Sequence, residues 1–510
     1  MGELSTTARR LAGASIGQGL ATVWSAALGL FTTPFLLGHL GAARYGMFAV
    51  ISVVSSYLSN LEFGFGHASL RFLARAHASG NLSDEQTVFG AGLTVFVAGA
   101  LLAAGLTFFG AHIIVSDFAH GSESLHQTFL AAVRIGAPII GVSMLSSFTA
   151  ASLQALGQYG RLIFLSWLAG TLLSVSAVTI AAAGGSLLAI MAAQLVINSL
   201  LLLAYCGLLI AASSSVVLHP HLSSGTFAAM AKFSGWLMLA GVATQTMVQA
   251  PTAVLSGFKT TAVVATYQVP NIIFQQLTGF VGAASFGFLP FASAASASDD
   301  PGPVRAIYIA NLRMTILVLA PLVSFLAVFA DPLLTFWLPR HFASQAAAPL
   351  ALLSGGSLVL GASAAPSDLA RGYGEAQLVT IYTTLTAVAV AALALLAVPG
   401  HGATGAAFAL SVGLGIVTIP FIFLVARRIL DLPPAALLRD LLGPLCALCL
   451  VAGLDVCGRL LADTIVSAAI TGATGTMIYL WANAKVFLDS RERRVLGSLL
   501  RRVRAVPATS

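Results

Sequence analysis

Long uninterrupted apolar runs, separated by short polar segments, recur along the whole chain. A helix of about 20 such residues crosses a hydrocarbon core about 30 Å thick, whereas the strands of a membrane barrel would alternate over about ten residues. The pattern therefore predicts an all-α integral membrane protein with fourteen spans, near residues 12–34, 45–66, 87–110, 128–150, 162–183, 186–211, 233–257, 262–288, 306–330, 346–369, 377–398, 402–425, 440–461 and 464–486.

The segments between the spans are short. The longest lie near residues 111–127 outside the membrane and near 67–86, 212–232 and 289–305 inside it, and we expect all four to be loops. None is long enough to fold as a domain of its own. The function is therefore expected to reside within the membrane.

Composition agrees with this interpretation. Only 8% of the residues are charged and 58% are hydrophobic, whereas soluble proteins carry about 25% charged residues. The four cysteines are too few for a disulfide framework. Cys446 and Cys449 form a CxxC, but no second ligand pair accompanies it, so we expect packing rather than zinc binding. No metal or other cofactor is predicted.

The distribution of basic residues sets the expected orientation. With both termini in the cytosol, nineteen of the 24 Lys and Arg residues fall on the inner side and five on the outer side. This bias follows the positive-inside rule. The net charge of +7 is thus explained by the cytosolic side, including a basic tail, and is not a nucleic-acid signal.

Two weak echoes suggest an internal repeat. GGSLLAIMAAQLV (184–196) matches GHGATGAAFALSV (400–412), and LGAARYGMFAVI (40–51) matches FKTTAVVATYQVPNII (258–273). Both echoes fit one period, as in transporters built from repeats. We expect an N-terminal lobe at 1–215, a C-terminal lobe at 216–432, two further spans at 433–487 and a cytoplasmic tail at 488–510.

The order of several motifs resembles a known family. A proline near the end of the first span is followed by LG, YG, an acidic residue, a glycine-rich turn and an arginine, and LQALGQYGR (153–161) follows later. The residues are Pro34, Leu40, Gly41, Tyr45, Gly46, Glu62, Gly64 and Arg71. This arrangement resembles the polysaccharide transporter branch of the multidrug/oligosaccharidyl-lipid/polysaccharide (MOP) superfamily, although that branch more often has aspartate where Glu62 stands.

The resemblance implies both a mechanism and partners. It implies two lobes around a central cavity that opens alternately to each side of the bacterial inner membrane. The expected activity is that of a flippase for a polyprenyl-diphosphate-linked oligosaccharide, the repeat unit of O-antigen, capsule or exopolysaccharide. The expected partners are this lipid-linked substrate, membrane lipids and a polysaccharide polymerase machinery, with no nucleic acid.

Polar side chains inside the spans are the first candidates for a substrate site. Two stripes at helical spacing place amides and hydroxyls on one face, which suits sugar hydroxyls. The alternative is that these groups bond neighbouring helices. The stripes consist of Gln245, Gln249 and Thr252, and of Gln268, Asn271, Gln275 and Thr278, with Gln18 and Asn60 as further cavity candidates.

Charges inside spans are costly and are the second set of candidates. Glu62 is a candidate for substrate binding or ion coupling, or else a partner for Arg71 or Arg75. Arg134 either faces a diphosphate or reaches the headgroups. Asp368 and Arg371 either pair with each other or form a gate or proton/sodium coupling site. Asp455 and Arg459 are expected to form a structural ion pair.

Two rival functions fit the sequence less well. A membrane-embedded polymerase or ligase usually carries a long outer loop with arginine, and the longest outer loop here has none. The acidic pairs Asp84–Glu85 and Asp299–Asp300 are expected in solvated loops, so no enzyme is predicted. A multidrug exporter of the same superfamily would rely on lobe carboxylates, of which the first lobe offers one candidate.

Overall fold

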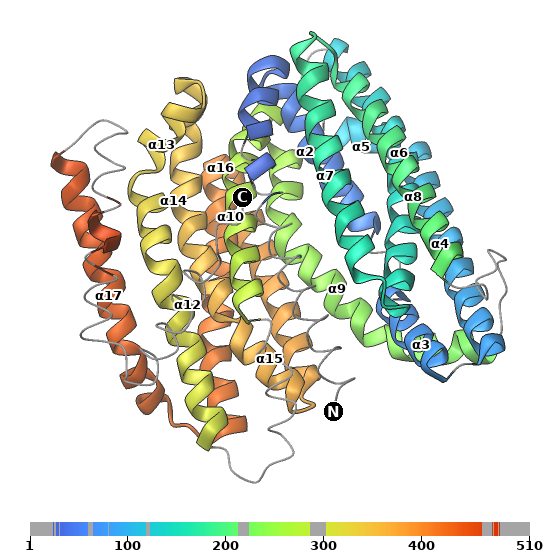
Figure 1. The fold of residues 1–510 in the computed structure, drawn as a ribbon. Helices are drawn as coiled ribbons and strands as arrows, with labels where there is room; N and C mark the ends of the chain where they lie inside the picture. The colour runs from blue at the N-terminus through green and yellow to red at the C-terminus, as the bar shows by residue number, and fades with distance from the viewer. Residues whose placement is uncertain are drawn as a thin grey trace, which may run out of the picture. The chain divides into compact units, whose positions relative to one another are not determined.

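Helices make up all the regular structure of the described residues, as the apolar runs predict (Figure 1). The computed structural model describes residues 24, 27–29, 31–59, 65–79, 81–118, 123–212, 224–285, 302–461, 472, 474–477 and 479. Eight helices of this described part are long and apolar enough to cross a membrane, and residues 27–40 and 42–55 form shorter apolar helices. The all-α membrane fold is confirmed, and the count of fourteen spans stays a prediction.

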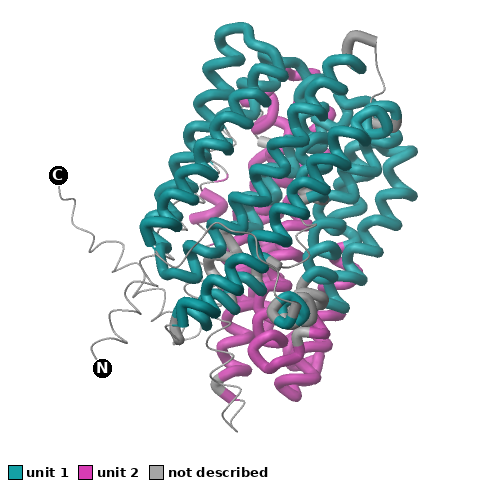
Figure 2. Tube along the Cα trace, turned by 90° about the vertical axis from the view of Figure 1, so that its right-hand side faces the viewer, with its two compact units in different colours: residues 1–283, 380–413 teal, residues 284–379, 414–510 magenta. Residues whose placement is uncertain are grey.

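The chain divides into two compact units (Figure 2). Unit 1 comprises Met1–Ala283 and Thr380–Gly413, and unit 2 comprises Ala284–Val379 and Leu414–Ser510. The lobe boundaries expected from the repeats stay a prediction. Unit 1 contains a helix at 31–40, α2 (Ala42–Ser59), α3 (Phe65–Ser79), α4 (Leu82–Phe109), α5 (Ala111–Phe118), α6 (Glu123–Ala155), α7 (Tyr159–Ala182), α8 (Leu187–Ala212), α9 (Ser224–Phe258) and α10 (Thr261–Ser285).

The core of unit 1 is built around α6, which packs against α2, α3, α4 and α8. Phe148 of α6 lies 5.1 Å from the ring of Phe89 and 4.9 Å from the ring of Phe96, centroid to centroid. A methyl group added at Gly92 would lie only 2.6 Å from the Phe148 ring. The small residue therefore lets α4 and α6 approach closely, as membrane helices commonly do.

In unit 2, α12 (Gly302–Val328) is the central helix and packs against α14 (Arg340–Ala362) and α17 (Pro434–Leu461). Two short helices, α13 (Ala330–Trp337) and α15 (Ala364–Gly372), adjoin α14. Buried hydroxyls form hydrogen bonds between packed segments of this unit. Tyr308 donates to the Ile422 carbonyl over 3.1 Å, and Tyr479 donates to the Leu317 carbonyl over 2.9 Å.

The helix α16 (Ala376–Leu430) contains a reversal that the sequence predicts. Gly402 has φ 53° and ψ −128°, which is not helical. A methyl group at Gly405 would lie 2.4 Å from the carbonyl oxygen of Ala397, although residues eight apart in a continuous helix are about 12 Å apart. The chain therefore turns back near Gly402, consistent with separate spans at 377–398 and 402–425.

Two of the expected loops are partly helical. The segment near 67–86 contains most of α3 and the start of α4, and the segment near 111–127 contains α5 and the start of α6. Asn81 caps α4 by accepting from the amide nitrogens of Ser83 and Asp84, at 3.1 and 3.4 Å. Helix α4 thus begins at a polar capping residue, and α3 and α5 are too short or too polar to stand out as apolar runs.

One acidic residue expected in a solvated loop is instead buried. Glu85 lies in the first turn of α4, is 3% exposed, and its Oε2 is 3.3 Å from Nδ1 of His77 on α3. Burial of a carboxylate is tolerated only when it is paired. The prediction was therefore wrong for Glu85, while Asp299 and Asp300 lie outside the described residues.

Large apolar side chains on the outside of the helices indicate contact with lipid. Phe109, Leu396 and Leu460 are 83%, 80% and 82% exposed. Such side chains are poorly suited to water when they recur over long helices, and they match the hydrocarbon of a bilayer. The chain is a multi-pass membrane protein.

Candidate functional site

The polar stripe on α9 runs from half-buried to fully buried positions. Gln245 and Gln249 are half-buried, and Thr252 is completely buried. Within the described part of the chain, the Thr252 hydroxyl has no hydrogen-bond partner. At its C-terminal end, the α9 stripe therefore has a buried hydroxyl that helix packing does not supply with a hydrogen-bond partner.

The stripe on α10 contains more such atoms. Asn271 is completely buried, and neither its amide oxygen nor its amide nitrogen has a partner among the described residues. The same holds for the Tyr267 hydroxyl and for Oε1 of Gln268. Each unsatisfied group costs several kcal/mol in hydrocarbon.

The C-terminal end of the α10 stripe differs from the part around Gln268 and Asn271. Gln275 is exposed, and the Thr278 hydroxyl donates to the Gln275 carbonyl over 2.9 Å. The alternative in which these amides bond neighbouring helices finds no supporting bond at Gln268 or Asn271 within the described residues. Their role in lining a cavity stays a prediction.

The two segments that echo each other in sequence touch within unit 1. A methyl group at Gly46, one turn into α2, would lie 1.7 Å from the carbonyl oxygen of Thr261, the first residue of α10. Only a residue without a side chain allows this backbone contact. The first turns of α2 and α10 are therefore held against each other.

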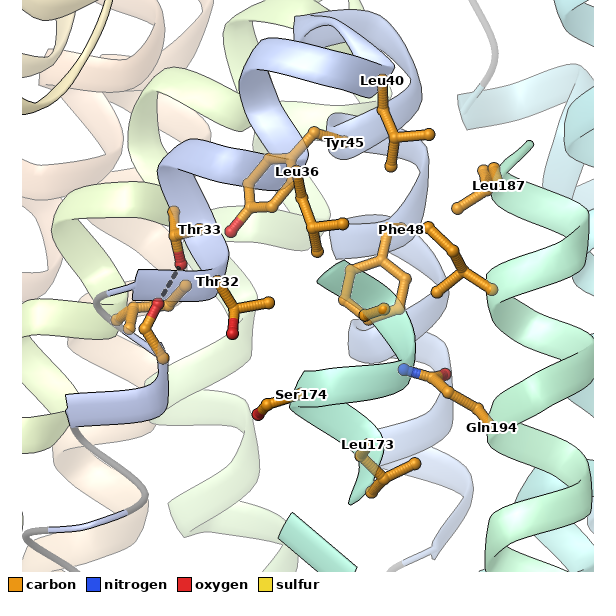
Figure 3. Close-up of a pocket in the computed structure, with 14 residues that line it drawn as sticks. Thr32, Thr33, Leu36, Leu40, Tyr45, Phe48, Leu173, Ser174, Leu187 and Gln194 are labelled. Carbon is orange, nitrogen blue, oxygen red and sulfur yellow. Dashed lines mark hydrogen bonds between the residues drawn. The ribbon is translucent and has the colours of Figure 1, made fainter. Parts of the chain in front are cut away.

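A cavity of about 180 Å³ lies beside this contact, also within unit 1 (Figure 3). It is lined by the helix at 31–40, by α2, α7 and α8, and by Ile272 of α10. The Thr33 hydroxyl in this lining donates to the Gly29 carbonyl over 2.7 Å, so it is satisfied by the residues just before it in the chain.

Three other polar side chains around the cavity have no partner. They are Thr32 from the helix at 31–40, Ser174 from α7 and Gln194 from α8, and Figure 3 shows them around the same space as Phe48. No hydrogen bond involves these three side chains within the described residues. The cavity thus offers two hydroxyls and an amide to an occupant.

The sequence interpretation missed Gln194. Gln194 and Asn198 stand at i and i+4 in the sixth span, which is the same signal used for the spans at 233–257 and 262–288. The two side chains differ in the structure. The Asn198 amide donates to the Gln194 backbone carbonyl of its own helix over 2.8 Å, whereas the Gln194 side chain lines the cavity.

Arg134 lies on an exposed part of α6 near the start of α5. Its Nη2 is 3.3 Å from Nε2 of His112, and its guanidinium carbon lies 5.7 Å from the centroid of the Phe108 ring. Phe108, Phe109 and Ile113 are all exposed around it. These neighbours favour an arginine that reaches the headgroups, and its role in diphosphate binding stays a prediction.

The remaining charged candidates divide between paired and undescribed residues. Asp368 and Arg371 form an i, i+3 pair on α15, with 3.4 Å between Oδ1 and Nη1. A pair does not by itself exclude a gate or coupling role, which stays a prediction. Gln18, Asn60 and Glu62 lie outside the described residues.

The predicted ion pair on α17 was wrong. Buried Asp455 accepts a short hydrogen bond from Ser324 of α12. Arg459 instead donates to the Val328 carbonyl over 2.6 Å and lies 3.9 Å from Asp331. Both side chains thus join α17 to other elements of unit 2, because partners from packed helices displace the i+4 neighbour.

The fold is similar to that of several solved transporters. A lipid II flippase, MurJ, in an inward closed conformation shares 14% identity, covering 91% of this chain and 98% of its own, with a TM-score of 0.72. An inward-facing multidrug resistance MATE transporter of the MOP superfamily also shares 14% identity, covering 82% and 96%, with a TM-score of 0.66. A MOP superfamily transporter from Pyrococcus furiosus has a TM-score of 0.60 at 14% identity, covering 83% and 96%. No curated protein sequence matches the chain.

The chain therefore has the fold of a multi-pass membrane protein that is similar to transporters of the MOP superfamily. These neighbours are flippases and transporters and not enzymes, in agreement with the sequence prediction. The chain belongs to the polysaccharide biosynthesis protein family, whose model matches residues 39–347.

Proposed function

We propose that this protein is a flippase that moves a polyprenyl-diphosphate-linked oligosaccharide repeat unit across the bacterial inner membrane by alternating access. Membership of the polysaccharide biosynthesis family supports a glycan substrate. The flippase whose fold it shares acts on lipid II, which its name identifies as a lipid-linked substrate.

The strongest structural support for the proposal is a set of neutral polar atoms without hydrogen-bond partners. The unpartnered polar atoms on α9 and α10 belong to Thr252, Tyr267, Gln268 and Asn271, all of which are neutral. Amides and hydroxyls exchange hydrogen bonds with sugar hydroxyls, whereas an exporter of cationic drugs needs negative charge to compensate its substrate. A glycan is the substrate that these groups match better.

The finer features of the proposal come from the sequence. In this proposal both termini face the cytosol. The cargo is a repeat unit of O-antigen, capsule or exopolysaccharide, and a polymerase machinery receives it on the outer side. The cavity candidates are Gln18, Asn60, Glu62, Arg134, Gln245, Gln249, Gln268, Asn271 and Gln275.

The decisive experiment is the sidedness of lipid-linked glycan in cells depleted of the protein. Polyprenyl-linked sugars are extracted from intact spheroplasts that were treated with an impermeant sugar-modifying reagent. We expect complete repeat units to accumulate in a form protected from the reagent. Repeat units that accumulate on the outer face, or no accumulation, would argue against a flippase and in favour of a later step or of drug export.

Variants link this assay to the residues. Asn271→Ala and Gln249→Ala should restore flipping less well than the wild type, because each removes an amide from the membrane-embedded stripes. Gln377→Ala is the matched control, since Gln377 is an exposed amide in the first turn of α16. If all three variants restore flipping equally well, the polar stripes on α9 and α10 do not bind the substrate.

A further inference from the structure

The cavity of unit 1 is lined mainly by apolar side chains, with a few polar side chains among them. The side chains of Thr32, Ser174 and Gln194 come from three different helices and have no hydrogen-bond partner within the described residues. All three are half-buried, so an occupant of the cavity can reach their polar atoms. A purely apolar occupant, such as a lipid chain, would leave the polar atoms of all three side chains without a hydrogen-bond partner.

The described lining also argues against a charged occupant. Among the described residues, those that line the cavity include no Asp, Glu, Lys, Arg or His. A diphosphate would have no cation from these residues opposite it, and an ammonium group would have no carboxylate. The occupant that fits this lining is therefore neutral and combines apolar surface with hydrogen-bonding groups.

An aromatic ring completes the pattern. Phe48 faces the same space as the three polar groups, and Leu36 and Leu173 add apolar surface (Figure 3). A sugar ring has an apolar C–H face and a rim of hydroxyls, so it matches an aromatic wall combined with hydroxyl and amide groups. The volume of about 180 Å³ is well above the roughly 15 Å³ that one water molecule needs, so the cavity has room for a small ligand.

We propose that this cavity is a binding subsite for one uncharged pyranose of the glycan, with Thr32, Ser174 and Gln194 bonding its hydroxyls and Phe48 against its C–H face. This inference rests on the proposed function, because it assigns the sugar portion of the transported substrate to a place in unit 1. The Gln194 amide can both donate to and accept from a sugar hydroxyl.

Purified protein in nanodiscs tests the subsite directly. The unfolding temperature is measured as a function of ligand concentration for four kinds of ligand. They are methyl glycosides of neutral hexoses, glucuronic acid, farnesol, and the oligosaccharide that mild acid releases from the cell's own lipid-linked pool. A ligand that binds only the folded state raises this temperature with its concentration, which gives an apparent Kd. We expect a neutral glycoside or the released oligosaccharide to bind.

Matched variants identify the residues. Gln194→Leu and Ser174→Ala should weaken binding at least tenfold without lowering the unfolding temperature of the ligand-free protein, because the groups removed have no partner. Asn198→Ala and Ser176→Ala are the controls, since Asn198 donates to the Gln194 carbonyl and Ser176 to the Leu173 carbonyl, over 2.8 and 3.0 Å. The controls should keep wild-type affinity. Thr32→Val provides a further test if Gln194→Leu does not fold.

The outcomes separate the subsite from the proposed function. Binding of farnesol alone, binding of no sugar, or unchanged affinity in Gln194→Leu and Ser174→Ala would overturn the subsite. Normal sidedness of lipid-linked glycan in depleted cells would overturn the flippase function instead, because that assay does not depend on the cavity.

Discussion

At the scale of single residues, two buried tyrosines differ in whether the hydroxyl has a partner. Tyr308 donates to the Ile422 carbonyl over 3.1 Å, whereas the Tyr267 hydroxyl has no partner among the described residues. Both side chains are completely buried. Replacing either one by phenylalanine keeps the apolar ring and removes only the hydroxyl.

This contrast gives a prediction for stability. Tyr308→Phe should lower the free energy of unfolding by about 1 kcal/mol, because the Ile422 carbonyl loses its donor. Tyr267→Phe should leave the free energy of unfolding unchanged or raise it by about 1 kcal/mol, because it removes an unmet polar group. Unfolding curves in detergent measure both, and a loss of stability in Tyr267→Phe would reveal a partner for its hydroxyl.

A second prediction concerns the hydroxyl that bonds Asp455. Ser324→Ala should destabilise unit 2 by about 1.5–3 kcal/mol, because a buried carboxylate loses a charge-assisted hydrogen bond. Ser344→Ala is the control, since the Ser344 hydroxyl is exposed and bonds only the His341 carbonyl of its own helix. Equal unfolding curves for the two variants would show that Asp455 is neutral or otherwise paired.

At the scale of elements, glycine decides how closely two helices approach. A methyl group at Gly46 would lie 1.7 Å from the Thr261 carbonyl oxygen, whereas Gly38, on the preceding helix, has nothing within 4 Å. Alanine at the first position must push α2 away from α10. Alanine at the second position meets open space and favours the helix.

The corresponding prediction compares the two alanine variants. Gly46→Ala should lower both the unfolding temperature and glycan flipping, since the first turns of α2 and α10 no longer meet. Gly38→Ala should retain flipping and raise stability by up to about 1 kcal/mol. Wild-type flipping by Gly46→Ala would show that transport does not require this contact.

Helix prediction succeeded where an element is long and apolar and failed where it is short. The runs at 87–110, 162–183 and 186–211 correspond to α4, α7 and α8 within a few residues. Helices α3 and α5 were instead expected as loops. Their local composition is mixed, and packing against α4 and α6 contributes to their stability.

At the scale of the whole molecule, ion coupling is the next property to test. Glu62→Gln and Asp368→Asn each remove a carboxylate that the sequence assigns to proton or sodium coupling. We expect at least one of them to alter the ion dependence of glycan flipping in membrane vesicles with an imposed gradient. Asp440→Asn is the control, because Asp440 lies in α17, outside the predicted lobes. Unchanged transport and ion dependence in both test variants would exclude these residues from coupling.

The sequence by itself determined the membrane class, most of the long helices, the glycine-led reversal near 402 and the resemblance to polysaccharide transporters. Hydropathy and glycine placement are local properties, so they can be read without knowing which helices meet. Only the tertiary structure decided which polar groups are paired. Asp455 bonds Ser324 rather than Arg459, and Gln194 faces a cavity while Asn198 bonds its own helix. Ser324 and Asp455, like the residues that line the cavity, lie on different helices far apart in the chain, and packing alone brings them together.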